Sequence, residues 1–134
     1  MPNVQLPLWT ALATLLVSLL LSCTAGWVGI QRLRTGVRAP AVSGDERFER
    51  ALRIQMNTQE GALAFLPSLW VCALFLDDRI AAALAVLWIC TRIGYALAYW
   101  ADPAGRRSSF LSSQALYVVT WISGAAGVLM RCLS

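Results

Sequence analysis

The chain opens on an apolar run that is long enough to cross a lipid bilayer. No charged residue precedes Arg32, and residues 4–30 are predominantly apolar. A helix needs about 20 such residues to span the bilayer core, whereas a cleaved secretory signal has an apolar segment of about 7–15 residues behind a basic one. We therefore expect residues 6–31 to form a retained transmembrane helix.

The composition extends this expectation to the whole chain. Of its 134 residues, 58% are apolar and 13% are charged, against about 45–50% and about 25% in soluble domains. Four spans of about 20 residues would use nearly all of the apolar residues. These values exclude a soluble globular domain and a disordered chain. They predict an all-α membrane protein, a four-transmembrane-helix bundle in one domain of residues 1–134, with spans at about 6–31, 53–76, 79–100 and 110–131.

The arginines predict how the bundle lies in the membrane. All 11 basic residues are Arg, and most of them lie in or beside the loops at 32–45 and 101–109. Basic loops face the cytoplasm in multi-pass proteins. We expect both loops on the cytoplasmic side and both termini on the opposite side. The net charge of +4 is then a signal of topology, and we expect no nucleic-acid partner.

The second helix is predicted to begin outside the membrane. Ser43 and Glu46 have the spacing of a capping box, so the helix should start near Gly44 or Asp45 and run to Phe75. At about 1.5 Å per residue its length is about 45 Å, which exceeds the bilayer core. Its first turns carry polar residues that suit a solvated face: Glu46, Glu49 and Arg50.

Three further polar residues on this helix fall at membrane depth: Arg53, Asn57 and Glu60. A charge there costs about 3 kcal/mol or more and usually faces the bundle interior. The set is either a structural clamp between helices or part of a ligand site. Counting depth along the third helix makes Arg92 the partner expected for Glu60, with Tyr95 and Tyr99 on the same helical face. Guanidinium groups bind carboxylates, so a peptide with two carboxylates and one amine would suit this set.

Residues 48–60 contain the pattern F-E-R-x-x-R-x-x-x-N-x-x-E. This pattern resembles the second-helix signature of the membrane-associated proteins in eicosanoid and glutathione metabolism (MAPEG), and residues 92–99 resemble the third-helix segment of that family. The resemblance implies a homotrimer that binds glutathione between neighbouring subunits. Arg92 is added to the implied ligand set because it lies at nearly the same depth as Glu60. The predicted glutathione-binding residues are then Arg32, Arg53, Gln55, Asn57, Glu60, Arg92, Tyr95 and Tyr99.

The resemblance also implies a reaction. Arg106 matches the arginine that stabilises the glutathione thiolate in the leukotriene-synthase branch, and Arg107 is the alternative because the loop alignment can shift by one residue. A nearby cation favours thiolate, the reactive form. We expect a glutathione transferase, with peroxidase activity as a further expectation, acting on a lipophilic electrophile or hydroperoxide that arrives from membrane lipid. Gly61 departs from that branch, which has a glutathione-contacting Tyr there.

Metal chemistry and transport are not expected. The four cysteines are scattered singly, the chain has no His, and no C-x-x-C spacing supports a zinc site, so glutathione is the one predicted co-substrate and no metal is predicted. Small multidrug transporters usually share an acidic residue within the first span. Residues 1–31 contain no acidic residue, so a transporter of this kind is not expected. The remaining alternative is a non-catalytic lipid-binding protein that resembles the 5-lipoxygenase-activating protein of the same family.

Overall fold

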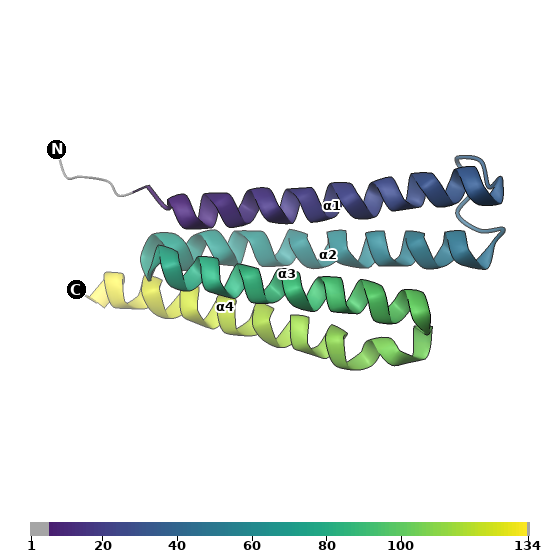
Figure 1. The fold of residues 1–134 in the computed structure, drawn as a ribbon. Coiled ribbons are helices and arrows are strands. Elements are labelled where there is room, and N and C mark those ends of the chain that lie inside the picture. The colour runs from purple at the N-terminus through teal and green to yellow at the C-terminus, as the bar shows by residue number, and fades with distance from the viewer. Residues whose placement is uncertain (1–5, 134) are drawn as a thin grey trace.

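The computed structural model describes residues 6–133, except for the side chain of Arg106. The chain forms four long helices and one short 3₁₀ turn: α1 (Leu8–Thr35), α2 (Glu46–Phe75), α3 (Asp78–Ala101), η1 (Pro103–Arg106) and α4 (Arg107–Leu133). The helices run alternately up and down in one bundle, with the α1–α2 loop and η1 at one end (Figure 1). The predicted four-helix all-α fold is confirmed.

Three of the helices in the described part of the chain are long and apolar enough to cross a membrane: α1, α3 and the segment Pro103–Leu133. Helix α2 has 30 residues, but Gln59, Glu60 and the charges before them shorten its apolar stretch. That the second span is completed by polar residues remains a prediction. Figure 1 shows the ends of α1 and α2 extending past the end of α3. That α2 projects beyond the membrane remains a prediction.

Helix α2 begins where the sequence predicts, but through a different cap. The Asp45 carboxylate accepts hydrogen bonds from the backbone N–H groups of Arg47 and Phe48, at 2.8 and 3.2 Å. Glu49 accepts one from the N–H of Gly44 at 3.0 Å. The predicted capping box of Ser43 and Glu46 is therefore wrong, because Asp45 takes the capping position with extended backbone angles and satisfies the first amides itself.

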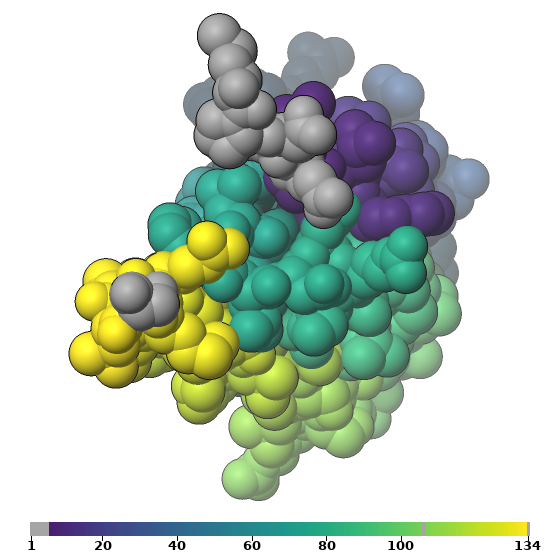
Figure 2. Space-filling model, turned by 90° about the vertical axis from the view of Figure 1, so that its left-hand side faces the viewer, coloured from purple at the N-terminus to yellow at the C-terminus, as the bar shows by residue number. Residues whose placement is uncertain are grey.

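The opposite end of the bundle is joined by two adjacent carboxylates. Asp77 caps its own helix, accepting from the N–H groups of Arg79 and Ile80. Asp78 instead accepts from two amides at the start of α1, Trp9 at 3.0 Å and Thr10 at 2.8 Å. The α1 cap residue, a proline, supplies no side-chain hydrogen bond, so α3 satisfies the unpaired amides of α1. Figure 2 looks onto this end, where the α2–α3 turn lies between the start of α1 and the end of α4.

Helix α2 packs against each of the other three helices. In the core its Phe65 stacks on Trp88 of α3, with ring centroids 4.6 Å apart. Helix α4 approaches α2 through small residues, because a Cβ atom at Gly127 would lie 2.8 Å from the backbone carbonyl of Phe75. Small residues at such contacts let helix backbones approach closely within a membrane. Helices α2, α3 and α4 thus form one packed unit, and its polar side chains form the site described next.

Candidate functional site

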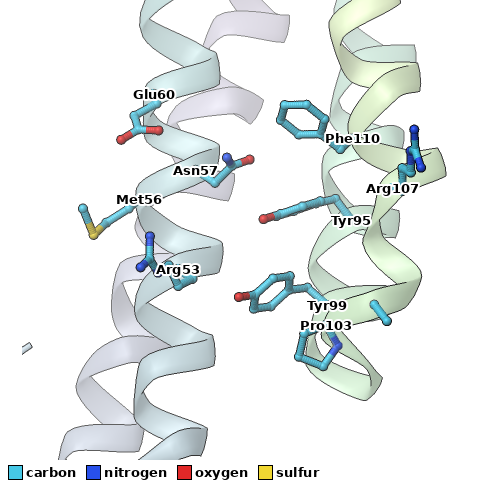
Figure 3. Close-up of a pocket in the computed structure, with 10 residues that line it drawn as sticks. Arg53, Met56, Asn57, Glu60, Tyr95, Tyr99, Pro103, Arg107 and Phe110 are labelled. Atoms are coloured by element: carbon cyan, nitrogen blue, oxygen red, sulfur yellow. The ribbon is translucent and has the colours of Figure 1, made fainter. Parts of the chain in front are cut away.

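A groove of about 770 Å³ lies between α2 on one side and α3, η1 and the start of α4 on the other (Figure 3). We call it the tyrosine groove. It is lined by Arg53, Met56, Asn57, Glu60, Tyr95, Tyr99, Pro103, Ala104, Arg107 and Phe110. Its volume falls within the range of about 300–1,000 Å³ that is usual for small-molecule sites. One groove therefore brings together five of the eight residues predicted to bind glutathione, and one of the two arginines predicted to act on its thiol.

The side chains in the tyrosine groove come from facing helices. The hydroxyls of Tyr95 and Tyr99 point toward α2, and Asn57 points back toward them (Figure 3). The two rings lie 5.8 Å apart. Glu60 and Met56 point to the other side of α2 (Figure 3), and Arg53 and Glu60 are exposed. The groove thus presents hydroxyls and an amide inside, with charged groups at its open edge.

Arg92 lies directly behind this groove and does not line it. Its side chain is only 2% exposed. It donates hydrogen bonds to Asn57 Oδ1 at 2.7 Å, to the Thr58 hydroxyl at 3.3 Å and to the Ser113 hydroxyl at 3.2 Å. Its guanidinium also lies 4.6 Å from the ring centroid of Tyr95. The buried cation is held by an amide, two hydroxyls and an aromatic face, and it orients Asn57 and Tyr95 from within the bundle.

The expected pairing of Arg92 with Glu60 is therefore not the one that forms. Arg92 meets Asn57, one helical turn earlier, while Glu60 is exposed. The reason is geometric: counting residues at about 1.5 Å each fixes depth along a helix but not direction around its axis. Direct contact of Arg92 with glutathione remains a prediction.

Two other predicted residues lie outside the groove within this subunit. Arg32 donates to the carbonyls of Ala41 and Val37, at 2.9 and 3.4 Å, and stacks 4.4 Å over the Phe48 ring, which ties the loop after α1 onto α2. Gln55 lines a separate shallow groove between α1 and α2. Glutathione contacts from these two residues remain predictions that would need a second subunit or a different arrangement of this loop.

The two candidate thiol-activating arginines stand at the junction of η1 and α4. Arg107 lines the tyrosine groove, but its guanidinium lies on the side of α4 away from α2 (Figure 3). The structure describes the backbone of Arg106 as the last residue of η1, and its side chain lies outside the described part. The assignment of Arg106, with Arg107 as the alternative, stays a prediction.

Comparison with known protein families now decides the family. The model of the MAPEG family matches residues 10–126. The chain belongs to the MAPEG family. With three helices suited to crossing a bilayer, this MAPEG chain is an integral membrane protein.

Similar curated proteins cover most of the MAPEG chain. An uncharacterised protein of the cyanobacterium Synechocystis is 42% identical over 120 residues, covering 87% of this chain and 88% of its own. Mouse microsomal glutathione S-transferase 2 is 31% identical over 122 residues, covering 88% and 83%. Rat leukotriene C4 synthase is 31% identical over 98 residues, covering 72% and 65%.

The sequence did not predict several residues that line the groove or support it from behind. Met56 lies one turn from both Arg53 and Glu60, so its helical spacing could have placed it in the groove. Phe110 falls at the predicted start of the fourth span and gave no polar signal. The hydroxyls of Thr58 and Ser113, which accept from Arg92, were hidden because such residues are common in membrane helices for packing reasons alone.

Proposed function

We propose that this protein is an integral membrane glutathione transferase that binds glutathione in the tyrosine groove and activates its thiol against a lipophilic electrophile. The observation that carries the proposal is the convergence of Arg53, Asn57 and Glu60 with Tyr95 and Tyr99 around one groove of about 770 Å³. The relatives named as microsomal glutathione S-transferase 2 and leukotriene C4 synthase support the same ligand.

The groove offers a group for each part of glutathione. Arg53 would bind a carboxylate through its planar fork, while Glu60 would accept hydrogen bonds from the ammonium group. Asn57, held by Arg92, would bind a peptide amide. The hydroxyls of Tyr95 and Tyr99 would orient the thiol. Because Arg92 already positions Asn57 and Tyr95, part of the ordering cost of binding is met before the ligand arrives.

A homotrimer is part of the proposal. The exposed positions of Arg53 and Glu60, and their place at the open edge of the groove, fit a site that a neighbouring subunit closes. Arg32 and Gln55, which lie outside the groove of their own subunit, would then contribute to the groove of a neighbour. This arrangement would give every predicted residue except the buried Arg92 access to one ligand.

The proposed chemistry needs no nucleophile from the protein. A guanidinium of Arg106, or alternatively Arg107, lowers the thiol pKa of bound glutathione by favouring the thiolate. The thiolate sulfur forms a new bond to an electrophilic carbon, and the leaving group departs with the displaced electron pair or, with an epoxide, the ring oxygen takes up a proton. With a hydroperoxide, two glutathione molecules supply the two electrons and become the disulfide, leaving an alcohol and water.

The alternative function, lipid binding without catalysis, has one observation in its favour. A mostly apolar groove of about 490 Å³ lies between α2 and α4, lined by Pro67, Ser68, Val71, Trp121, Ala125, Val128 and Leu129. Such a surface suits an acyl chain whether or not a reaction follows. It would also serve a transferase as the approach of its lipophilic substrate.

Conjugation and peroxidase assays on purified protein in detergent separate the two functions. The transferase proposal predicts that a chloro-nitroarene is conjugated to glutathione, and that Asn57→Ala and Tyr99→Phe reduce kcat/KM. Leu111→Ala, an exposed apolar residue of α4 outside the groove, is the matched control and should leave kcat/KM unchanged. Glutathione binding without turnover of any haloarene, epoxide or hydroperoxide would favour the alternative.

A further inference from the structure

A second cavity lies at the loop end of the bundle, where α1 ends, α2 begins and α3 ends. It has a volume of about 280 Å³ and is lined by Gln31, Arg34, Arg47, Arg50 and Trp100. We call it the arginine cavity. It shares no lining residue with the tyrosine groove, and none of its residues has a part in the proposed transferase. Three of its five lining residues carry guanidinium groups.

Gln31 is the most telling residue of the arginine cavity. Its side chain is 2% exposed, and its Nε2 group donates to no acceptor among the described residues. Buried polar groups in proteins are nearly always hydrogen-bonded, and one left unpaired costs about 1–3 kcal/mol. The amide N–H of Gln31 therefore indicates an acceptor that binds in the cavity.

Arg50, which also lines the cavity, has a second unpaired donor. One terminal nitrogen donates to the Trp100 carbonyl at 3.0 Å, and the other pairs with Glu46. Its Nε is buried and has no acceptor in the described part of the chain. The guanidinium is thus held by two partners while one donor stays unpaired.

The positive charges that line the arginine cavity are not neutralised by an equal number of carboxylates. Arg34 and Arg47 are exposed, and the described structure pairs neither side chain with a carboxylate, while the guanidinium of Arg34 lies 5.8 Å over the Trp27 ring. Glu46, bound to Arg50, is the one carboxylate paired with a lining residue. Three cations against one anion leave the cavity with an excess of positive charge.

The position of the cavity indicates where the anion comes from. Gln31 and Arg34 lie in the last turns of α1, and Trp100 lies next to the end of α3. Both helices are candidate spans, so they leave the apolar layer toward this end of the bundle. Trp100 packs edge-on against Trp27 at 5.3 Å, and tryptophans gather at the level of lipid headgroups. Basic clusters at this level attract anionic lipids.

We propose that the arginine cavity binds a phosphate group, and that its source is the headgroup of an anionic membrane phospholipid. Arginine forks match phosphate oxygens in pairs, and the cavity is lined by three arginines and by Gln31, whose buried amide lacks an acceptor. The cavity has little more than a third of the volume of the tyrosine groove, which suits a phosphate and not a tripeptide. A soluble phosphate would use the same donors, so the test separates the two sources.

The test is binding of phosphatidylglycerol, with phosphatidylcholine as the neutral comparison, to purified protein in a neutral detergent. Arg34→Gln and Arg47→Gln each remove one cation from the cavity wall, and Arg38→Gln removes one exposed cation that does not line the cavity. We expect the Kd for phosphatidylglycerol to rise about tenfold or more in the cavity variants, as for loss of a charged hydrogen bond. Arg38→Gln should raise it less than about fivefold, the effect of a single cation near the surface.

A fourth variant and a soluble probe complete the design. Gln31→Leu removes the unpaired amide, so it should raise the thermal midpoint without lipid and diminish the stabilisation by phosphatidylglycerol. Binding of inorganic phosphate with no preference between the two lipids would support the phosphate site but overturn its lipid source. Equal losses in Arg38→Gln and the cavity variants would overturn the site, because diffuse surface charge would then explain the binding. The site would also be overturned if the protein bound no inorganic phosphate and did not distinguish phosphatidylglycerol from phosphatidylcholine.

Discussion

Arg92 offers the sharpest single perturbation of the site, because it is buried yet acts on groove residues. Arg92→Met replaces the cation with an apolar side chain of similar length. The hydroxyls of Thr58 and Ser113 lose the Arg92 donor but stay bonded, since they donate to the carbonyls of Ile54 and Phe110, both at 2.8 Å. Asn57 borders the groove and can turn to water. The partners of Arg92 in the described part of the chain are neutral, so its removal leaves no buried charge unpaired, and we expect no fall in the thermal midpoint.

Glutathione affinity should fall in the same variant. Asn57 loses its 2.7 Å hydrogen bond and Tyr95 loses the guanidinium 4.6 Å from its ring. Asn57 borders the groove and must then be ordered when the ligand binds, at about 0.5–1.5 kcal/mol. Tyr95 is only 3% exposed and stays packed. The single cost raises the Kd for glutathione about 2–13-fold. Calorimetric titration measures the Kd, and tryptophan-fluorescence melting measures the thermal midpoint.

A double-mutant cycle decides how Arg92 acts. If it works through Asn57, then Arg92→Met should weaken binding much less in an Asn57→Ala background than in the wild type. Additive losses would refute this reasoning, because Arg92 would then act through Tyr95 or through a glutathione contact of its own. A wild-type Kd in Arg92→Met alone would refute both roles.

Three further outcomes follow from the same structure. Gly127→Ala should lower the free energy of unfolding by about 0.5–2 kcal/mol, since overpacking outweighs the gain in helix propensity. Gly29→Ala is the control and should not lower it, because nothing lies within 4 Å of the new Cβ. Equal melting temperatures of the two variants would contradict the close α2–α4 contact. Asp78→Ala should cost about 0.5–2 kcal/mol as a lost helix cap and speed hydrogen exchange at the first amides of α1, and unchanged exchange there would show that the cap is dispensable. Either Arg106→Ala or Arg107→Ala should abolish the thiolate absorbance of bound glutathione without abolishing the binding measured by calorimetry. If both variants keep the thiolate absorbance, neither arginine activates the thiol.

The sequence predicts most of this fold, and the reasons lie in particular residues. The uncharged run before Arg32 defines α1, and the polar residues from Asp45 onward explain why α2 starts outside the apolar layer. Helical spacing also places Arg53, Asn57 and Glu60 along one helix, and Tyr95 with Tyr99 on another. Both kinds of inference depend on periodicity within a single helix, which the sequence contains directly.

What the sequence does not predict depends on rotation between helices. Asp78 could equally cap its own helix, and only the packing of α3 beside α1 turns its carboxylate to Thr10. Arg92 could reach several polar residues of α2, and the rotation of that helix selects Asn57 over Glu60. Such choices are set by side-chain packing across the whole bundle and by no local pattern.

We propose above that the tyrosine groove binds glutathione and holds its thiol as thiolate. The most direct measurement is the ultraviolet absorbance of thiolate when purified protein is titrated with glutathione, compared with S-methylglutathione, which has no ionisable thiol. We expect a saturable thiolate signal with glutathione, none with the methylated ligand, and a Kd raised by Asn57→Ala. Absence of both thiolate absorbance and calorimetric binding at millimolar glutathione would contradict it.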